Sequence, residues 1–363
     1  MNRTGFADLP LHGGQCPRWL FKRMVPLSKA ICDAINHERG TRELLARLSN
    51  PYFFQSLSCA IGFDWHSSGT TTTTCGALKQ ALRENDYGLF AAGGKGKASR
   101  KTPLEIKAAA EKQGFTDAKT TALLKATRMS AKVDSSCVQD GFELYHHSFF
   151  FNERGEWTVV QQGMNAEQGG ARRYHWHSRS VASFVEKPHE GIACDFVVPK
   201  CLDLTNAANS PLRGGSVELL QERSLRTMLT GQTTLTQCTP ACLKMHSHHE
   251  VLPCDLNRKS VERLMQLAQQ PPENFEQLAA AGGVGGRTLR ALALTAEIVY
   301  GTPVDWSDPA KYSFAHGGKD GFPYPVDRKL YDNTIETLRN AIDAAELGNR
   351  EKLDCLERLA RNV

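Results

Sequence analysis

The stretch GVGGRTLR at residues 283–290 has the composition of a tight glycine turn that leads into a helix. Glycine lets backbone N–H groups approach an anion closely, and the start of a helix favours negative charge. Arginines are unfavourable there unless an external anion accompanies them, and no acidic residue follows before Glu297. We therefore expect this turn to bind a DNA phosphate without recognising a base; the alternative is a plain corner between two helices with solvated arginines. The residues expected to hold the phosphate are Gly283, Gly285, Gly286, Arg287 and Arg290.

Paired histidines and paired glutamines form a second group with chemical potential. Aromatic and β-branched residues at 144–151 and 157–162 flank a short turn, which predicts a β-hairpin that carries His146, His147, Gln161 and Gln162. Neighbouring strand positions point to opposite faces, so at most one histidine faces a given site. Acidic and titratable side chains lie near this hairpin in the sequence. In the alternative in which the protein is a metal-dependent nuclease, we expect its active site here. These nearby residues are Asp140, Glu143, Glu186 and His189.

Two basic segments are further candidates for contact with a nucleic acid. Residues 93–101 place Lys95, Lys97, Arg100 and Lys101 on what the glycines predict to be a flexible loop, and the alternative is a solvated loop without a partner. Residues 172–177 combine Arg172 and Arg173 with aromatic residues that are able to stack on bases. Core packing of Tyr174 and Trp176 is the competing interpretation of that segment.

Other clusters fit known chemistry poorly. The spacing of Cys238 and Cys242 before the histidines at 246, 248 and 249 does not match structural zinc patterns. His66 precedes two serines, but the chain contains no GxSxG segment of the kind that carries a serine nucleophile. We therefore expect neither a zinc site nor serine hydrolysis.

The pattern of apolar residues predicts the elements that position these groups. Helical periodicity occurs at 17–35, 41–48, 75–83, 217–229, 258–269, 274–281, 287–300, 329–347 and 350–361. Further strands are expected near 184–185 and 195–198. The sequence predicts an α+β fold, with a mixed domain at 1–204 that contains an antiparallel hairpin and an all-helical domain at 205–363.

Composition bounds the class of protein. The chain has 363 residues, 40% of them hydrophobic, and a net charge of +5, which suits a globular protein with an anionic partner. Eleven cysteines occur without a repeated CxxC pattern, and neither a signal segment nor a membrane span is evident. We expect a cytoplasmic protein with reduced thiols and no membrane partner; its oligomeric state is left open.

Several strings resemble the bacterial and archaeal family called domain of unknown function 763, over nearly the whole chain. They are RTGFADLPLHGG (3–14), GFDWHSSGTT (62–71), GGKGK (93–97), VVQQGM (159–164) and ARRYHW (171–176). This resemblance implies a shared full-length architecture and no established chemistry.

Residues 278–338 are also similar to the core of helix-hairpin-helix DNA glycosylases. In that family an aspartate begins the next helix, and the matching residue here is Asp327. The resemblance implies that Asp327 stabilises positive charge on the sugar while a flipped base is removed; its alternative role is a helix cap. The family's lyase members carry a lysine where this chain has Arg287, so Schiff-base chemistry is not expected.

The function expected from the sequence is therefore a DNA-binding, DNA-repair enzyme, a glycosylase that needs no cofactor. A divalent-metal nuclease at the histidine hairpin and a non-catalytic DNA-binding protein are the alternatives. Duplex and single-stranded DNA are both admissible partners.

Overall fold

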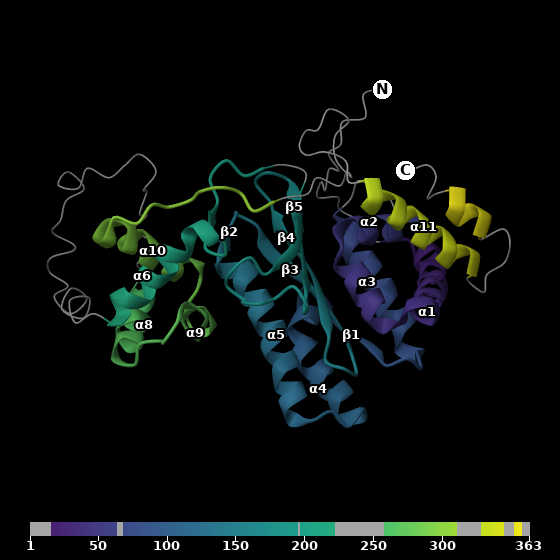
Figure 1. The fold of residues 1–363 in the computed structure, drawn as a ribbon, viewed down its shortest axis with the longest axis horizontal. Helices are drawn as coiled ribbons and strands as arrows, with labels where there is room; N and C mark the ends of the chain where they lie inside the picture. The colour runs from purple at the N-terminus through teal and green to yellow at the C-terminus, as the bar shows by residue number, and fades with distance from the viewer. Residues whose placement is uncertain are drawn as a thin grey trace.

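The computed structural model describes residues 16–63, 68–194, 197–221, 258–310, 328–344 and 352–357. Its centre is a five-stranded antiparallel sheet with the strand order β1-β3-β4-β5-β6 (Figure 1). The strands are β1 (Leu89–Lys95), β3 (Glu143–Asn152), β4 (Trp157–Asn165), β5 (Gly170–His177) and β6 (His189–Ala193). The predicted hairpin is confirmed as β3 and β4, and the α+β class is confirmed with it.

The sheet is buried on both faces because its strands alternate apolar side chains between two helical layers. Phe149 and Phe151 pack in one core with Leu123 and Val133 of helix α5 (Asp117–Ser136). Phe150 packs in the other core, together with side chains of the N-terminal helices. We call these the α5 face and the α1–α3 face of the sheet.

The α1–α3 face is covered by α1 (Arg18–Ser49), α2 (Pro51–Ala60) and α3 (Gly69–Ala81). The helices expected at 17–35 and 41–48 are one element, α1, interrupted at Gly40, which has a φ of 81°. Asn50 caps α2 through its side chain, which accepts hydrogen bonds from the backbone N–H groups of Tyr52 and Phe53. The threonine run lies inside α3, where packing against the sheet buries Thr70, Thr71 and Thr74.

The predicted flexible basic loop is instead ordered structure. Lys95 ends β1, and Lys97, Arg100 and Lys101 lie on the 3-10 helix η2 (Gly96–Lys101), which leads into α4 (Thr102–Lys112). Gly93 has a φ of 90°, and a Cβ there would lie 2.2 Å from the carbonyl oxygen of His147. Close packing of β1 on β3 thus fixes the start of the segment, while its four cationic side chains remain exposed.

A short pair of strands joins the sheet to the C-terminal part. After α5 comes β2 (Val138–Gln139), which pairs with β7 (Leu202–Asp203). The 3-10 helix η3 (Ala207–Asn209) follows β7, and η1 (Leu82–Glu84) follows α3. This β2–β7 pair holds Asp203 beside the end of α5.

The C-terminal helices divide between the two ends of the molecule. One group packs together on the side of α5 and consists of α6 (Ser210–Gln221), α8 (Arg258–Gln269), α9 (Phe275–Ala280) and α10 (Gly286–Tyr300). Residues 301–310 then return to the sheet as an extended segment (Figure 1). The last long helix, α11 (Arg328–Ala344), packs on α1 and α2. The apolar face of α11 packs in the N-terminal core, and the single helical domain at 205–363 stays a prediction.

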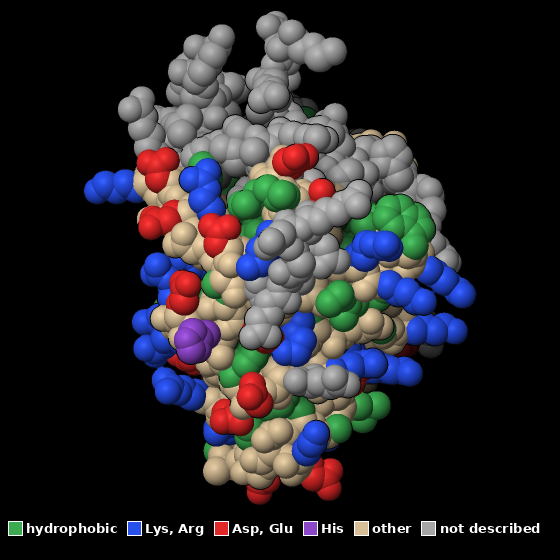
Figure 2. Space-filling model, turned by 90° about the vertical axis from the view of Figure 1, so that its right-hand side faces the viewer, with side chains coloured by type: hydrophobic (Ala, Val, Ile, Leu, Met, Phe, Trp, Pro, Cys, Tyr) green, Lys and Arg blue, Asp and Glu red, His purple; other side chains and the backbone are tan. Residues whose placement is uncertain are grey.

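Charge on the α1 and α11 side is mixed rather than concentrated. Figure 2 shows lysine and arginine side chains along the edges of this face with acidic side chains among them. Among the described residues, no helix is long and apolar enough to cross a bilayer.

Candidate active site

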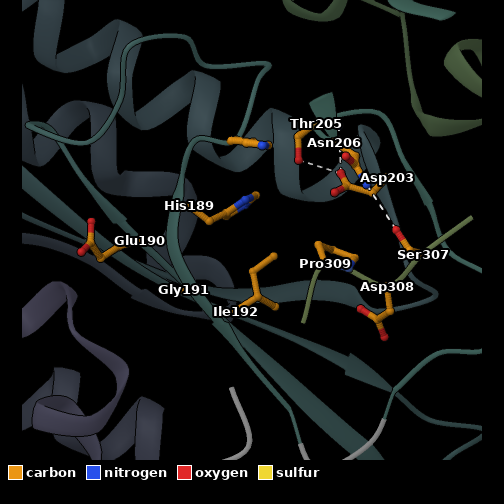
Figure 3. Close-up of a pocket in the computed structure, with 11 residues that line it drawn as sticks. His189, Glu190, Gly191, Ile192, Asp203, Thr205, Asn206, Ser307, Asp308 and Pro309 are labelled. Carbon is orange, nitrogen blue, oxygen red and sulfur yellow. Dashed lines mark hydrogen bonds between the residues drawn. The ribbon is translucent and has the colours of Figure 1, made fainter. Parts of the chain in front are cut away.

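A pocket of about 230 Å³ lies where β6, β7 and residues 307–309 of the returning segment meet. Polar side chains from these elements and from the residues next to them line it, among them Lys187, His189, Asp203, Asn206 and Asp308. Figure 3 shows the His189 ring and the Asp203 side chain directed into the same space, whereas Asp308 points away from it. The pocket therefore exposes a titratable ring and a carboxylate to one bound molecule.

His189 is held by a buried carboxylate behind it. Its Nε2 atom lies 2.6 Å from Oδ1 of Asp134, which comes from the last turn of α5 and is fully buried. The other ring nitrogen, Nδ1, has no hydrogen-bond partner among the described residues. A carboxylate that orients one ring nitrogen and leaves the other accessible is the arrangement of a general base.

Asp134 is surrounded by hydrogen-bond donors. Its Oδ2 atom accepts from Gln161 Nε2 at 2.5 Å and from the indole Nε1 of Trp176 at 2.9 Å. The pKa of Asp134 is raised overall by burial, and the charge and hydrogen bond of His189 and the hydrogen bond of Trp176 act against that shift. The indole N–H of Trp176 can only donate, and His189 Nε2 lies against the other oxygen, so these two neighbours favour the ionised carboxylate.

Asp203 supplies a second carboxylate at the pocket. Its Oδ1 atom accepts from the Thr205 backbone at 2.8 Å and from the Thr205 hydroxyl at 2.6 Å. Burial raises the pKa of Asp203, and these hydrogen bonds lower it. No described residue hydrogen-bonds Oδ2, so this oxygen is free to interact with a bound molecule.

The returning segment is fastened to the sheet by a buried ion-pair cluster. Arg172 of β5 donates to both carboxylate oxygens of Asp308, at 2.8 and 2.7 Å, and to Asp140 at 3.1 Å. Burial lowers the pKa of Arg172, but the carboxylates outweigh burial and raise it overall. The Tyr174 hydroxyl donates to Asp140 at 2.6 Å. This cluster fixes the wall of the pocket opposite His189.

The rim of the pocket contains a strained residue. Lys187 has a φ of 44°, and no other non-glycine residue in the described ranges has a positive φ. Its backbone N–H donates to the Thr205 carbonyl at 2.9 Å, which holds the conformation. Such strain costs on the order of 1–2 kcal/mol and concentrates at functional sites.

The predicted hairpin residues form two rows across the sheet, one on each face. His147, Gln161 and Tyr174 are opposed in the strand register on the α5 face. The row on the α1–α3 face comprises Lys95, His146, Gln162 and Arg173. The expectation that His146 and His147 point to opposite faces is confirmed by their separate partners, Ser148 and Thr127. Burial lowers the pKa of His146 to about 3 and that of His147 to about 4.

A sequence model of the family described as "Protein of unknown function (DUF763)" matches residues 5–326. The chain belongs to this family. The resemblance inferred from the motifs is thereby confirmed, while no match supports the similarity to helix-hairpin-helix glycosylases. Neither the curated proteins nor the solved structures that were compared contain a match to the chain.

Two arginines expected to contact DNA are placed differently in this DUF763 member. Arg172 and Arg173 are both fully buried. Arg173 donates to Gln55 at 3.1 Å and to Thr71 at 3.3 Å, and burial lowers the pKa of its guanidinium. The expected DNA contact is thus corrected, since both side chains point into protein layers. The competing interpretation, core packing of Tyr174 and Trp176, is confirmed.

The glycine turn lies between α9 and α10, as predicted. Gly283 has a φ of 80° and is exposed together with Gly282, whereas Val284 is fully buried. The buried side of the turn is fixed by hydrogen bonds to its carbonyl groups, from Lys132 to Val284 and from Gln139 to Gly286 at 2.8 Å. No acidic residue lies in the first turn of α10, where Arg287 is exposed and Arg290 is half-buried. The exposed side of the turn is therefore glycine backbone beside cationic charge.

Several predicted sites lie outside the described residues. They are Asp327, His66 and the cysteine and histidine cluster at 238–249. Within the described ranges, no group of three or more His, Cys, Asp or Glu side chains is arranged to hold a metal ion.

Sequence reasoning missed three carboxylates of the pocket region, namely Asp134, Asp203 and Asp308. Asp134 had a detectable signal, because Thr127, Ser130 and Asp134 recur at helical spacing on the buried face of α5. Asp203 lies on the two-residue strand β7 and Asp308 on the extended segment 301–310, and neither is long enough or regular enough to give such a signal.

Proposed function

We propose that this protein is a DNA base-excising hydrolase that cleaves N-glycosidic bonds in the pocket of His189. One observation carries the proposal: His189, oriented by Asp134, and the carboxylate of Asp203 face the same pocket. Breaking this type of bond builds positive charge on the sugar, and a nearby carboxylate stabilises that charge. The role expected for Asp327 is thus proposed for Asp203.

The chemistry requires only water and the nucleotide. The Nδ1 atom of His189 takes a proton from water, and the water oxygen forms a bond to the sugar C1′ atom. The bond from C1′ to the base breaks, its electron pair leaves with the base, and the base takes up a proton from solvent. The Asp203 carboxylate lies beside the sugar as positive charge develops, and Asp134 stabilises the protonated ring of His189.

DNA as the substrate is supported by the turn between α9 and α10. Its exposed glycines and Arg287 are suited to hold a backbone phosphate. Replacing Gly283 and Gly285 together by valine is expected to weaken duplex binding about tenfold or more, because each side chain blocks approach to the turn. A double variant that stays folded and binds duplex DNA with unchanged affinity removes this part of the proposal.

The direct test is excision from fluorescent oligonucleotides that carry deaminated, oxidised or alkylated bases, with alkali-labile sites as the readout. The variant His189→Gln is expected to excise bases roughly 10²–10⁴ times more slowly than wild type, because glutamine cannot act as the general base that takes the proton from water. His37→Gln is the matched control, since His37 is exposed. Excision by wild type that is unchanged in His189→Gln contradicts the proposal.

Two further arms separate the alternatives. Comparing Asp203→Asn with Asp327→Asn shows which carboxylate stabilises the sugar, and we expect the larger loss for Asp203→Asn. Addition of EDTA distinguishes a nuclease, because metal-dependent cleavage stops when the metal is chelated and breaks strands without alkali. Strand cleavage of that kind, or inertness on the whole panel with retained salt-sensitive binding, overturns the glycosylase proposal.

A further inference from the structure

Behind the pocket, a continuous series of buried hydrogen bonds leads from α5 through two strands and back to Asp134. The Thr127 hydroxyl lies 2.7 Å from His147 Nε2, and His147 Nδ1 lies 2.8 Å from Gln161 Oε1. Gln161 Nε2 then lies 2.5 Å from Asp134 Oδ2. These four side chains are each at most 6% exposed, so water does not compete for their hydrogen bonds.

Hydrogen-bond polarity fixes the direction of every group in the series. An ionised Asp134 requires a donor, so the amide nitrogen of Gln161 faces it and the amide oxygen faces His147. His147 must then carry its proton on Nδ1, which leaves Nε2 to accept from the Thr127 hydroxyl. The lowered pKa of His147, about 4 because of burial, agrees with a neutral ring.

We infer that Gln161 is a positioning residue, which holds Asp134 in the ionised state and in the orientation that His189 needs. This inference rests on the proposed function. The Gln161 amide has no route to the pocket of its own, since its two hydrogen bonds are with His147 and Asp134. It acts on the reaction only through the carboxylate.

The neighbouring Gln162 provides a matched control on the other face of the sheet. It is equally buried, but its amide donates to the Ser68 carbonyl at 2.7 Å and to the Tyr145 hydroxyl. The variants Gln161→Leu and Gln162→Leu thus remove the same group from adjacent positions of β4. Loss of a hydrogen-bonded core amide affects folding in both, whereas only Gln161→Leu removes a donor to Asp134.

The test combines activity with an observation that does not need activity. In wild type, the proton between His189 Nε2 and Asp134 is expected as a low-field signal in the proton NMR spectrum. Gln161→Leu is expected to shift or remove that signal and to lower kcat about tenfold or more with little change in KM. Gln162→Leu is expected to leave both unchanged. A Gln161→Leu protein that keeps the signal and the wild-type kcat overturns the inference.

The isosteric variant Gln161→Glu separates positioning from packing through its pH profile. At low pH the neutral carboxyl donates to Asp134 as the amide did, so the low-field signal and activity should approach those of wild type. As pH rises, ionisation places a second charge against Asp134, and both should be lost on the basic side. A variant that is equally impaired at every pH contradicts the inference.

Other charged or titratable groups near His189 enter the pH profile as well, and they are common to wild type and variants. They are Lys187, Glu190, Asp203 and Asp308 at the pocket, and Asp134 and Tyr174 behind it. If wild type excises no base, the proposed function fails, yet the NMR arm still decides whether Gln161 holds Asp134.

Discussion

The two faces of the central sheet use the same residue types for different purposes. On the α5 face, His147 and Gln161 connect to the carboxylate of Asp134, which in turn holds a ring at an open pocket. On the α1–α3 face, His146 bonds to Ser148, and Gln162 bonds to Ser68 and Tyr145. On the α5 face, α5 contributes the carboxylate of Asp134 and the returning segment contributes that of Asp308. These buried carboxylates make the α5 face suited to acid–base chemistry.

Strand register explains why adjacent residues acquire such different surroundings. His146 and His147, Gln161 and Gln162, and Arg172 and Arg173 are each split between the faces because side chains alternate along a strand. Two identical residues that are adjacent in the sequence therefore lie in different environments, one on each face of the sheet. Variants of adjacent residues are the natural way to examine the difference.

The largest effect is expected from Arg172→Met on the α5 face. The substitution leaves Asp140 and Asp308 as buried carboxylates without their cation, which costs about 3–5 kcal/mol of unfolding free energy. Urea unfolding of the variant and of wild type measures the loss. Arg287→Met is the control, because Arg287 is exposed and its loss should cost at most about 0.5 kcal/mol. A loss for Arg172→Met below about 1 kcal/mol contradicts the role given to this cluster.

Because a histidine is buried on each face of the sheet, we expect the folded protein to lose stability at acid pH. The pKa of His146 in the folded protein is lowered to about 3 from an ordinary value of 6.5, because the ring is buried. As pH decreases, this histidine is therefore protonated in the unfolded chain at a higher pH than in the folded protein. The free energy of unfolding falls as pH decreases from about 6.5 toward 3. Each such histidine contributes a slope of about 1.4 kcal/mol per pH unit in that window.

The variant His146→Gln is expected to lose this slope, and unfolding titrations between pH 4 and 6 measure it. The same loss is expected for His147→Gln, whose pKa is lowered to about 4. Buried Asp134 and Asp203 oppose the histidines, since their raised pKa values favour the folded state at low pH. The difference between variant and wild type isolates the histidine. Equal slopes in wild type and His146→Gln exclude a neutral buried ring.

The smallest effect concerns the strained rim of the pocket. Lys187→Gly relieves a positive φ and is expected to raise the unfolding free energy by roughly 0.5–1 kcal/mol, since glycine adopts this conformation without strain. The comparable exposed variant Lys200→Gly should be neutral or slightly destabilising. Thermal unfolding of both variants provides the comparison. A destabilised Lys187→Gly protein shows that the side chain, rather than the backbone, governs stability there.

Local patterns predicted the parts of the fold that local interactions determine. The β3–β4 hairpin follows from alternating aromatic and β-branched residues around a glycine-containing turn, and α8 matches the predicted bounds 258–269. Strand β5 was missed because its arginines and histidines are typical of a surface. Arg172 and Arg173 are accommodated inside by pairing with a buried carboxylate and a buried amide.

The candidate site was less predictable, because its parts come from distant segments. Asp134, His189, Asp203 and Asp308 belong to α5, β6, β7 and the returning segment, and nothing in their spacing places them together. The hairpin histidines were recognised as chemically notable, and His189 was noted among their neighbours. Which of them faces an open pocket depends on the packing of α5, which the sequence does not encode locally.

The excision rate of Asp134→Asn tests the central claim most directly. The variant keeps the size of the side chain but removes the charge that orients His189 and stabilises its protonated form. We expect the protein to fold, to bind duplex DNA as wild type does, and to excise bases on the order of 10³ times more slowly. An Asp134→Asn protein that removes bases at the wild-type rate contradicts the account.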